Sequence, residues 1–375
     1  MMRNLSIQSN LPTMLLQYIL LHKTSNMVVQ DNILVQDGLR ELQRRLPPGW
    51  TVSEAALEPA MGAVDAVAKI KSPDRRMGTL ALQARARLEP KSVRALVEAT
   101  PGVRSPEVLV VLARYLSERT RALLQELEVS YLDLTGNARI VVPKPGLFIE
   151  TEGATEDPDR EDRLARSLRG AKAGRIVRAL IDTKQPPRVR EIAALTKCDA
   201  GYVSRVLAFL DTEALITRVG YGRMQSVDWP ALLRRWAQEA PLESRGKART
   251  YLDPRGLSVL VARLARSSER YAITGTLAAA AFAPTAPARL ATVWVRGAAE
   301  AATRIGLRPV EAGANVLLIE PGDEGVFGGA VQRDGVWYAA PSQVAVDLLT
   351  SPGRGPAEGE ALIHWMLANE GGWRR

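Results

Sequence analysis

The sequence predicts a multidomain protein of the α/β and α+β classes, in which a pair of helices and a hairpin separate two α/β domains. The chain has 375 residues, a length that suggests two or three domains. Its hydrophobic content of 46% is sufficient for well-formed cores. Strand-like and helix-like apolar patterns alternate towards both ends of the chain, whereas the middle holds an amphipathic helix pair and a glycine-containing reversal.

The middle of the chain, residues 188–227, predicts a helix, a tight turn, a second helix and a short hairpin. Apolar residues in the second helix recur at i, i+3, i+4 and i+7, which is the spacing of one buried stripe. These residues are Val203, Val206, Leu207 and Leu210. The turn position that usually holds glycine is Lys197, which must adopt a positive φ unless the turn differs.

A tip of Gly220-Tyr221-Gly222 separates strands predicted over 215–219 and 223–227. Glycine allows the chain to reverse tightly there. The two helices and the hairpin resemble a winged helix-turn-helix. That resemblance implies that the second helix, about 200–212, enters the major groove of DNA and that the wing, 215–227, contacts the flanking DNA.

The positive charge of the chain is concentrated around this helix pair. The net charge is +9, and residues 160–250 hold 19 Lys and Arg against 10 Asp and Glu. The rest of the chain holds 31 of each kind, so the whole excess lies in this segment. Because phosphate contacts dominate affinity for nucleic acid, the sequence predicts double-stranded DNA as the partner. A solvated basic surface is the alternative that the charge alone leaves open.

Three groups of residues are the candidates for DNA contact. The outward face of the second helix is expected to reach base edges, through Gly201, Tyr202, Ser204 and Arg205. The hairpin is expected to flank or enter the minor groove, through Arg218, Tyr221 and Arg223. Contacts to phosphate are expected from Lys172, Arg175, Arg188, Arg190 and Lys197.

The N-terminal part divides into an extension and a domain. Residues 1–30 are predicted to be disordered or weakly helical, because their apolar run over 15–21 is far shorter than the ~20 residues of a membrane span. Residues 31–152 form an α/β domain. Its helices are predicted over 34–46, 90–98 and 117–127, and its strands over 51–57, 63–70, 78–88, 108–113 and 129–134.

This order of elements resembles the restriction-endonuclease-like fold of the PD-(D/E)XK superfamily. The resemblance implies an Asp on the second strand and an E-x-K on the third, which hold a divalent metal and activate water. The second strand here offers Asp65, but the third offers Gln83 and Arg85 in the place of E-x-K. An amide oxygen is uncharged and a guanidinium cannot act as a neutral base, so the domain is predicted to be inactive. Asp65, Gln83 and Arg85 are vestigial candidates, and no catalytic or metal-binding residue is assigned.

Tyr131, Asp133 and Asn137 are polar residues at the end of the last of these strands and in the turn at Gly136. They could form a small site, but they are predicted to close the turn through hydrogen bonds to its backbone. A further hairpin is predicted over 140–149, and a polar linker over 152–162.

The central module is predicted to span residues 163–239. Its first helix is expected over 173–182, with Gly170 and Gly174 interrupting any longer helix. A closing helix is expected over 229–238, and a second, charged linker over 240–253.

Residues 254–375 are predicted to form the C-terminal α/β domain. Its helices are expected over 257–264, 277–283, 298–305, 342–349 and 359–368, and its strands over 291–295, 316–319 and 336–340. Four motifs occur in order, YAITG at 271–275, GANV at 313–316, APSQ at 340–343 and PGRGPAEGEA at 352–361. With the preceding helix-turn-helix they resemble the AbiEi family of winged-helix antitoxins of type IV toxin–antitoxin systems. The resemblance covers residues 164–373 and implies repression at inverted repeats, and a nucleotidyltransferase-like toxin as a protein partner.

Several chemistries are disfavoured by the residues present. Thr274-Gly275-Thr276 is similar to the glycine turn of nucleotidyltransferases, but the following strand, 291–296, has no carboxylate to hold magnesium. Cys198 is the only cysteine and the chain has 2 His, which disfavours disulfides, zinc clusters and His-dependent triads. There is no phosphate-binding or dinucleotide fingerprint, so no cofactor is expected. We expect a cytoplasmic protein with no membrane association.

The function that the sequence predicts is a sequence-specific DNA-binding transcriptional regulator. Two alternatives stay open, a metal-dependent DNA nuclease that uses residues 31–152 and an antitoxin that acts through a protein toxin. A homodimer would suit paired half-sites in DNA, although no residue requires one.

Overall fold

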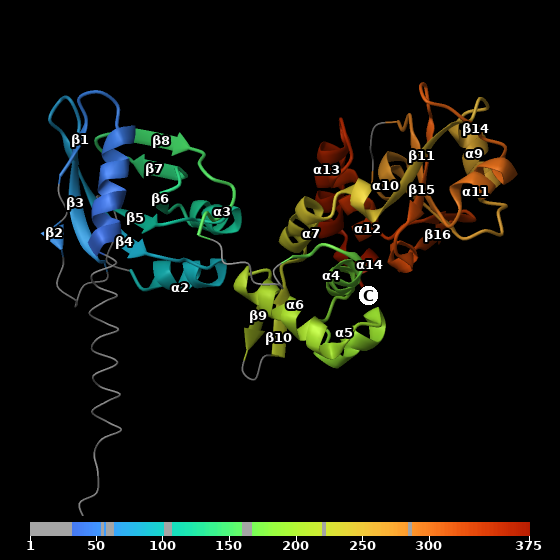
Figure 1. The fold of residues 1–375 in the computed structure, drawn as a ribbon, viewed down its shortest axis with the longest axis horizontal. Coiled ribbons are helices and arrows are strands. Elements are labelled where there is room, and N and C mark those ends of the chain that lie inside the picture. The colour runs from blue at the N-terminus through green and yellow to red at the C-terminus, as the bar shows by residue number, and fades with distance from the viewer. Residues whose placement is uncertain are drawn as a thin grey trace, which may run out of the picture. The chain divides into compact units, whose positions relative to one another are not determined.

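The computed structural model describes residues 32–53, 64–100, 107–159, 167–219, 223–283 and 287–375, together with the backbone of a short strand at 56–57. The chain forms two compact units, residues 1–162 and 163–375 (Figure 1). Each unit combines helices with a large sheet, so the protein is a multidomain α/β protein. No helix in the described ranges is long and apolar enough to cross a membrane. The predicted extension over 1–30 lies outside the described residues.

The first unit is built on a mixed sheet that has eight strands within the described residues. The strand order is β1-β3-β4-β5-β6-β7-β8, with β2 beside β3. The central strands β4, β5 and β6 are parallel, and the outer neighbours are antiparallel. The strands are β1 Thr51–Val52, β2 Ala56–Leu57, β3 Ala66–Lys71, β4 Met77–Arg85, β5 Glu107–Ala113, β6 Ser130–Asp133, β7 Ala138–Val142 and β8 Leu147–Thr151.

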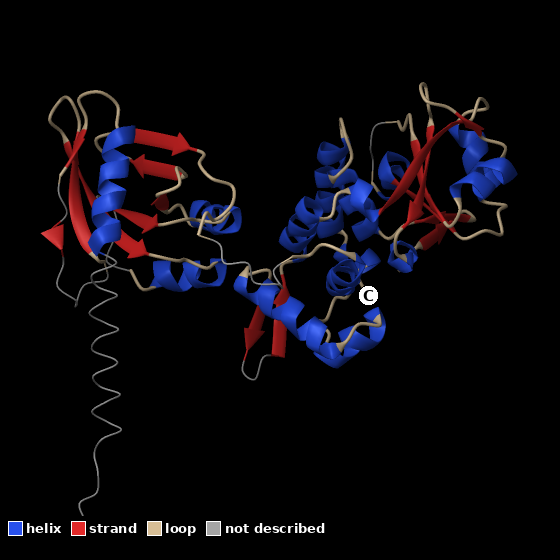
Figure 2. Cartoon of the chain, in the orientation of Figure 1, coloured by secondary structure: helices blue, strands red, loops and turns tan. Residues whose placement is uncertain are grey.

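Helices cover this sheet because they bury apolar stripes on it and connect its parallel strands. A helix over 32–45 lies beside the sheet (Figure 2). It buries one apolar stripe, including Leu39 and Leu42, against alternate strand residues such as Leu82 and Leu112. On the opposite face of the sheet Val111 is fully buried as well. The parallel strands need crossover connections, which η1 Pro90–Ser92, α2 Val93–Glu98 and α3 Glu118–Glu126 supply. The predicted order of elements is observed, except that the strand predicted over 51–57 is split into β1 and β2.

Asp133 closes the turn after β6, as predicted. Its Oδ1 accepts hydrogen bonds from the backbone N of Thr135 at 2.9 Å and of Asn137 at 3.0 Å. Its Oδ2 accepts from Asn137 Nδ2 at 2.9 Å and from the backbone N of Leu116, also at 2.9 Å. Oδ1 also accepts from Thr135 Oγ1 at 2.7 Å. These five donors fully occupy the carboxylate, so its role is structural.

The second unit begins with a helix–hairpin module, which we define as residues 167–239. Its elements are α4 Ala171–Asp182, α5 Val189–Thr196, α6 Ala200–Thr212, β9 Ile216–Val219, β10 Arg223–Val227 and α7 Trp229–Glu239. Gly174 does not interrupt α4, contrary to the sequence prediction, but lies inside it. A Cβ at Gly174 would stand 3.1 Å from Cζ2 of Trp236 in α7, so the glycine allows the two helices to approach closely.

Lys197 ends α5 in the left-handed conformation, with φ 53° and ψ 38°. Its backbone N donates to the carbonyl oxygen of Ala193, and the backbone N of Cys198 donates to the same oxygen at 3.2 Å. The turn therefore has the geometry that glycine normally provides, although a lysine occupies it. Of the two possibilities that the sequence left open, positive φ is the one observed.

Replacing Lys197 with glycine is expected to stabilise the second unit by about 0.5–1 kcal/mol, because glycine adopts left-handed angles without a Cβ clash. Urea unfolding followed by tryptophan fluorescence measures the change, since Trp50 is the only one of the 7 tryptophans outside this unit. The matched control is Lys184→Gly, which should lose stability because Lys184 is not among the residues with positive φ. Equal destabilisation by both variants would contradict the conformational argument.

The remainder of the second unit, residues 240–375, is called the C-terminal part. Its mixed sheet has the strand order β14-β11-β15-β13-β12-β17-β16. The strands are β11 Gly246–Leu252, β12 Tyr271–Thr274, β13 Ala291–Val295, β14 Arg308–Pro309, β15 Val316–Pro321, β16 Val331–Arg333 and β17 Val336–Tyr338. The helices are α8 Leu242–Arg245, α9 Leu257–Leu264, α10 Gly275–Phe282, α11 Ala298–Ile305, η2 Glu324–Phe327, α12 Pro341–Leu349, α13 Gly355–Ala368 and α14 Glu370–Trp373.

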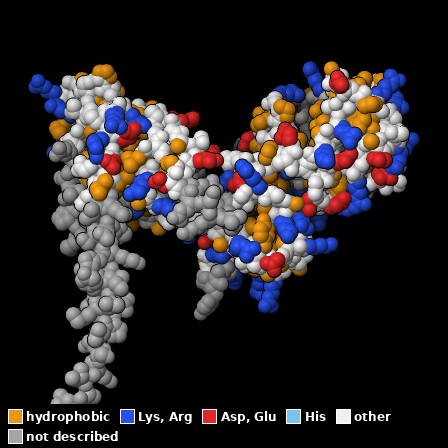
Figure 3. Space-filling model, viewed as in Figure 1, with side chains coloured by type: hydrophobic (Ala, Val, Ile, Leu, Met, Phe, Trp, Pro, Cys, Tyr) orange, Lys and Arg blue, Asp and Glu red, His pale blue; other side chains and the backbone are white. Residues whose placement is uncertain are grey.

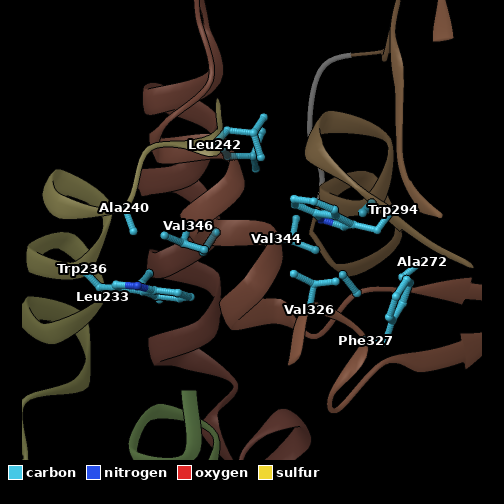
Figure 4. Close-up of a cluster of buried hydrophobic side chains, with 14 of the residues drawn as sticks. Leu233, Trp236, Ala240, Leu242, Ala272, Trp294, Val326, Phe327, Val344 and Val346 are labelled. Atoms are coloured by element: carbon cyan, nitrogen blue, oxygen red, sulfur yellow. The ribbon is translucent and has the colours of Figure 1, made fainter. Parts of the chain in front are cut away.

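The stretch over 240–253 is not a linker, contrary to the sequence prediction. It contains α8 and β11, and β11 pairs antiparallel with β15 along its length, from Gly246 opposite Pro321 to Tyr251 opposite Val316. The helix–hairpin module and the C-terminal part also share one continuous hydrophobic core. Figure 4 shows Trp236 of α7 and Val346 of α12 in this cluster. The module is therefore packed directly on the C-terminal part.

Candidate nucleic-acid interface

The helix α6 has one buried face and one exposed face. Val203, Val206, Leu207 and Leu210 are buried as the sequence predicts, and Phe209 joins them at the edge of the stripe. Gly201, Ser204 and Arg205 are exposed on the other face, and Tyr202 is half-buried. The structure therefore brings together all four residues that the sequence placed on the outward side of this helix.

Asp199 caps the N-terminus of α6, where its Oδ1 accepts from the backbone N of Tyr202 at 3.0 Å. The guanidinium carbon of Arg205 lies 5.8 Å from the centre of the Tyr202 ring. Burial raises the pKa of the Tyr202 phenol, the neighbouring Cys198 raises it further, and Arg205 opposes both. The phenol consequently stays protonated at neutral pH and can both donate and accept a hydrogen bond.

Five further cations lie in or next to the elements that adjoin α6 in the sequence. They are Lys172, Arg188, Arg190, Lys197 and Arg223. All are exposed, and none forms an ion pair with another residue in the described ranges. Lys and Arg side chains project from the surface below α5 and α6 in Figure 3. Unpaired, solvated cations of this kind are available to phosphate.

The hairpin β9–β10 pairs antiparallel, with Arg223 opposite Val219 and Arg218 opposite Met224. A register shift between Met224 and Ser226 marks a bulge, which increases the twist of the hairpin. Arg218 is half-buried and Arg223 is exposed. Tyr221 and the glycines of the tip lie outside the described residues.

Arg175 is not placed with the other candidates. It is half-buried on the side of α4 that faces the C-terminal part, and its Nε lies 3.7 Å from Asp323 Oδ1. A phosphate contact by Arg175 is therefore inconsistent with its position. Sequence periodicity could not show this, because Asp323 follows it by about 150 residues.

Other arginines of the basic segment are also used internally. Arg234 forms two hydrogen bonds to Glu360, at 2.8 and 2.6 Å, and this contact lowers the pKa of the Glu360 carboxyl. Arg249 lies 3.9 Å from Glu320. Part of the positive charge of residues 160–250 is thus paired with carboxylates of the C-terminal part. Only the rest of this charge is free for a ligand.

The vestigial nuclease positions in the first unit are occupied by protein contacts. Asp65 Oδ2 accepts from the backbone N of Ala84 at 2.8 Å and from Arg85 Nη1 at 3.0 Å. Gln83 is buried in β4. A guanidinium therefore occupies the side of Asp65 on which a cation would be needed. No group of acidic, His or Cys side chains with the arrangement of a metal site occurs among the described residues.

One buried carboxylate was missed by the sequence reasoning. Asp347 of α12 is 1% exposed and accepts four hydrogen bonds. Its Oδ1 accepts from Arg245 Nη1 and, at 2.8 Å, from Gln343 Nε2. Its Oδ2 accepts from Thr274 Oγ1 at 2.6 Å and from Trp294 Nε1 at 2.8 Å. The Thr274-Gly275 turn is therefore tied to a structural network rather than to a nucleotide site.

The same network reaches the helix–hairpin module. Gln343 Oε1 accepts from Arg178 Nη1 of α4 at 2.8 Å. Arg178 also donates to Asp182 Oδ2 and to the carbonyl oxygen of Gly328. The first helix of the module is thereby fixed to α12 by buried polar contacts as well as by apolar packing.

Comparison of the chain with protein-family models, with curated proteins and with solved structures gives no match.

Proposed function

We propose that this protein is a sequence-specific double-stranded DNA-binding regulator of transcription and that its helix–hairpin module is a winged helix-turn-helix. The observation that carries the proposal is the exposed face of α6. Its opposite face is buried, a hairpin follows it directly, and the elements next to it in the sequence carry exposed cations that form no ion pair with a described residue. The major groove, about 12 Å wide, admits an α-helix presented in this way.

Each side chain has a distinct role in the proposed complex. Arg205 would donate two hydrogen bonds to a guanine edge, and Tyr202 and Ser204 would contact neighbouring bases. Arg218 and Arg223 would lie along the minor groove on either side of the hairpin. The remaining cations, Lys172, Arg188, Arg190 and Lys197, would bind phosphates and fix the register of the protein on the duplex.

Arg205→Ala is expected to weaken binding to the preferred site by about 1–3 kcal/mol and to relax the preference at one base pair. Arg190→Ala is expected to weaken binding to preferred and random duplexes equally, because phosphates carry no sequence information. Fluorescence anisotropy on labelled duplexes of both kinds measures the two effects. Loss of the same size on both duplexes for both variants would contradict the assigned roles.

We further propose that the first unit is a restriction-endonuclease-like domain without nuclease activity. The parallel centre β4-β5-β6 with its crossover helices supports the fold, and the contact of Arg85 with Asp65 supports the inactivity. Supercoiled plasmid incubated with the protein and Mg²⁺ or Mn²⁺ is expected to stay intact. Nicking that disappears in Asp65→Ala would contradict this proposal and establish a nuclease.

An antitoxin role rests on the resemblance to the AbiEi family. Copurification of the chain with a nucleotidyltransferase-like protein would test it. It is compatible with DNA binding, since the helix–hairpin module and the C-terminal part present separate surfaces.

A further inference from the structure

A groove of about 530 Å³ lies within the second unit, between the helix–hairpin module and the C-terminal part. We propose that this groove is a binding site for a small aromatic carboxylate. Its volume is within the range of roughly 300–1,000 Å³ that holds small ligands in proteins. The site is separate from the DNA-binding face of α6, none of whose residues lines it.

Aromatic side chains of the C-terminal part form one wall of the groove, and residues of α4 and α5 form the other. Phe282 of α10, Trp365 of α13 and Trp373 of α14 come from the C-terminal part. The ring centres of Phe282 and Trp365 are 6.0 Å apart with 38° between their planes. The module contributes α4 and the exposed Leu195 of α5. A planar ring would bury its faces against these side chains.

Two arginines give the groove its preference for an anion. Arg333 of β16 lies with its guanidinium carbon 4.6 Å from the Phe282 ring centre and donates to the carbonyl oxygen of Ala281. It forms no ion pair with any described carboxylate. Arg175 has only its loose contact with Asp323, and its buried Nε has no hydrogen-bond partner within the described ranges.

Two other charged side chains of the lining are already compensated. Asp182, the one acidic side chain among the residues that line the groove, accepts two hydrogen bonds from Arg178. Arg374 contacts Glu370 and the carbonyl oxygens of Ile181 and Thr183. Arg375 also lines the groove and is exposed. The side chains of the groove therefore offer guanidinium donors and no free carboxylate, which favours an anion of low charge. The forked donors of arginine match a carboxylate group in particular.

Binding of the ligand would also change the affinity of the α6 face for DNA. This part of the proposal rests on the proposed function. The ligand would contact α4 and α5, which pack on α6, together with three aromatic residues of the C-terminal part. Any change in the affinity for DNA on ligand binding must be matched by an equal change in the affinity for ligand on DNA binding.

The test is calorimetric titration of the full chain with 2-naphthoate and with its neutral analogue 2-naphthylmethanol. We expect naphthoate to bind at least tenfold more tightly than the alcohol. Arg333→Gln should weaken naphthoate at least tenfold, whereas Arg308→Gln, an exposed arginine of β14 outside the groove, should not. Equal binding of the two compounds, no binding of either, or equal effects of the two variants would overturn the proposal.

A second pair of variants tests the site independently, in case Arg333→Gln does not fold. Leu195→Glu places a carboxylate in the groove and should weaken naphthoate at least tenfold, whereas Ala194→Glu, the exposed neighbour outside the groove, should not. Circular dichroism confirms that each variant is folded. DNA binding is measured separately on the same samples. Naphthoate binding without DNA binding contradicts the proposed function and supports this site, and the reverse result contradicts this site alone.

Discussion

Asp347→Ala is expected to lower the free energy of unfolding of the second unit by about 3–5 kcal/mol. The substitution leaves the guanidinium of Arg245, whose side chain is 11% exposed, without its buried carboxylate. It also removes the acceptor for Thr274, Trp294 and Gln343 at the same time. An uncompensated buried charge and several unsatisfied donors are each costly, so a large loss of stability is expected.

Urea unfolding followed by tryptophan fluorescence measures this loss, because Trp294 itself donates to Asp347. The matched control is Glu311→Ala, an exposed carboxylate of the same unit that forms no ion pair with a described residue, and it should change stability by less than about 0.5 kcal/mol. Asp347→Asn should fall between the two, since the amide keeps one acceptor oxygen. A loss in Asp347→Ala no larger than in the control would refute the structural role of the network.

The affinity for a random DNA duplex is expected to fall about 10³-fold between 50 and 200 mM salt. Six exposed cations that form no ion pair with a described residue underlie this value. On a random duplex, Arg205 and Arg223 have no preferred site to contact and would bind phosphate together with Lys172, Arg188, Arg190 and Lys197. Each cation that neutralises a phosphate releases counterions, so six contacts give a slope of log K against log salt near roughly −5.

The double variant Arg190→Gln, Arg223→Gln is expected to reduce that slope by about 2, because two phosphate contacts are lost. Arg308→Gln, far along the chain in β14, should leave the slope unchanged and is the matched control. Anisotropy titrations at four salt concentrations suffice to obtain each slope. A slope near zero for the unmodified protein, or a double variant identical to the control, would show that these cations do not bind phosphate.

The helix–hairpin module was predictable because its signals are local. The apolar stripe of α6 follows from 3.6-residue periodicity, and the hairpin follows from glycine at its tip. The sequence limited Lys197 to a positive φ or a different turn, because the turn between two closely spaced helices admits few backbone conformations, and the structure has the positive φ. Such features depend on residues within one or two turns of each other.

The errors arose where distant residues decide the structure. β11 has largely exposed side chains, so its sequence lacks a strand pattern. It is ordered by pairing with β14 and β15, which follow it by some 60 to 70 residues. The sequence predicted that Gly174 interrupts the helix, whereas α4 continues through it and Trp236 packs beside it. The sequence predicted that Arg175 binds phosphate. Its partner Asp323 is remote in the sequence, so the sequence did not reveal this contact.

Asp347 illustrates the limit most clearly. The sequence predicts only a helix over 342–349, and acidic side chains are rarely fully buried unless they are paired. The burial of Asp347 is possible only because donors from α8, β12 and β13 converge on it in the folded unit. The spacing of residues along the sequence does not show which distant donors will surround a side chain in the folded protein.

Selection of genomic DNA fragments by the purified protein tests most directly whether α6 recognises a sequence. The unmodified protein is predicted to enrich a recurrent motif at physiological salt. Arg205→Ala should enrich a motif that is degenerate at one base pair, while Arg190→Ala should recover the same motif with lower yield. Enrichment of no motif by the unmodified protein, or an unchanged motif with Arg205→Ala, would contradict recognition of DNA bases by Arg205 in α6.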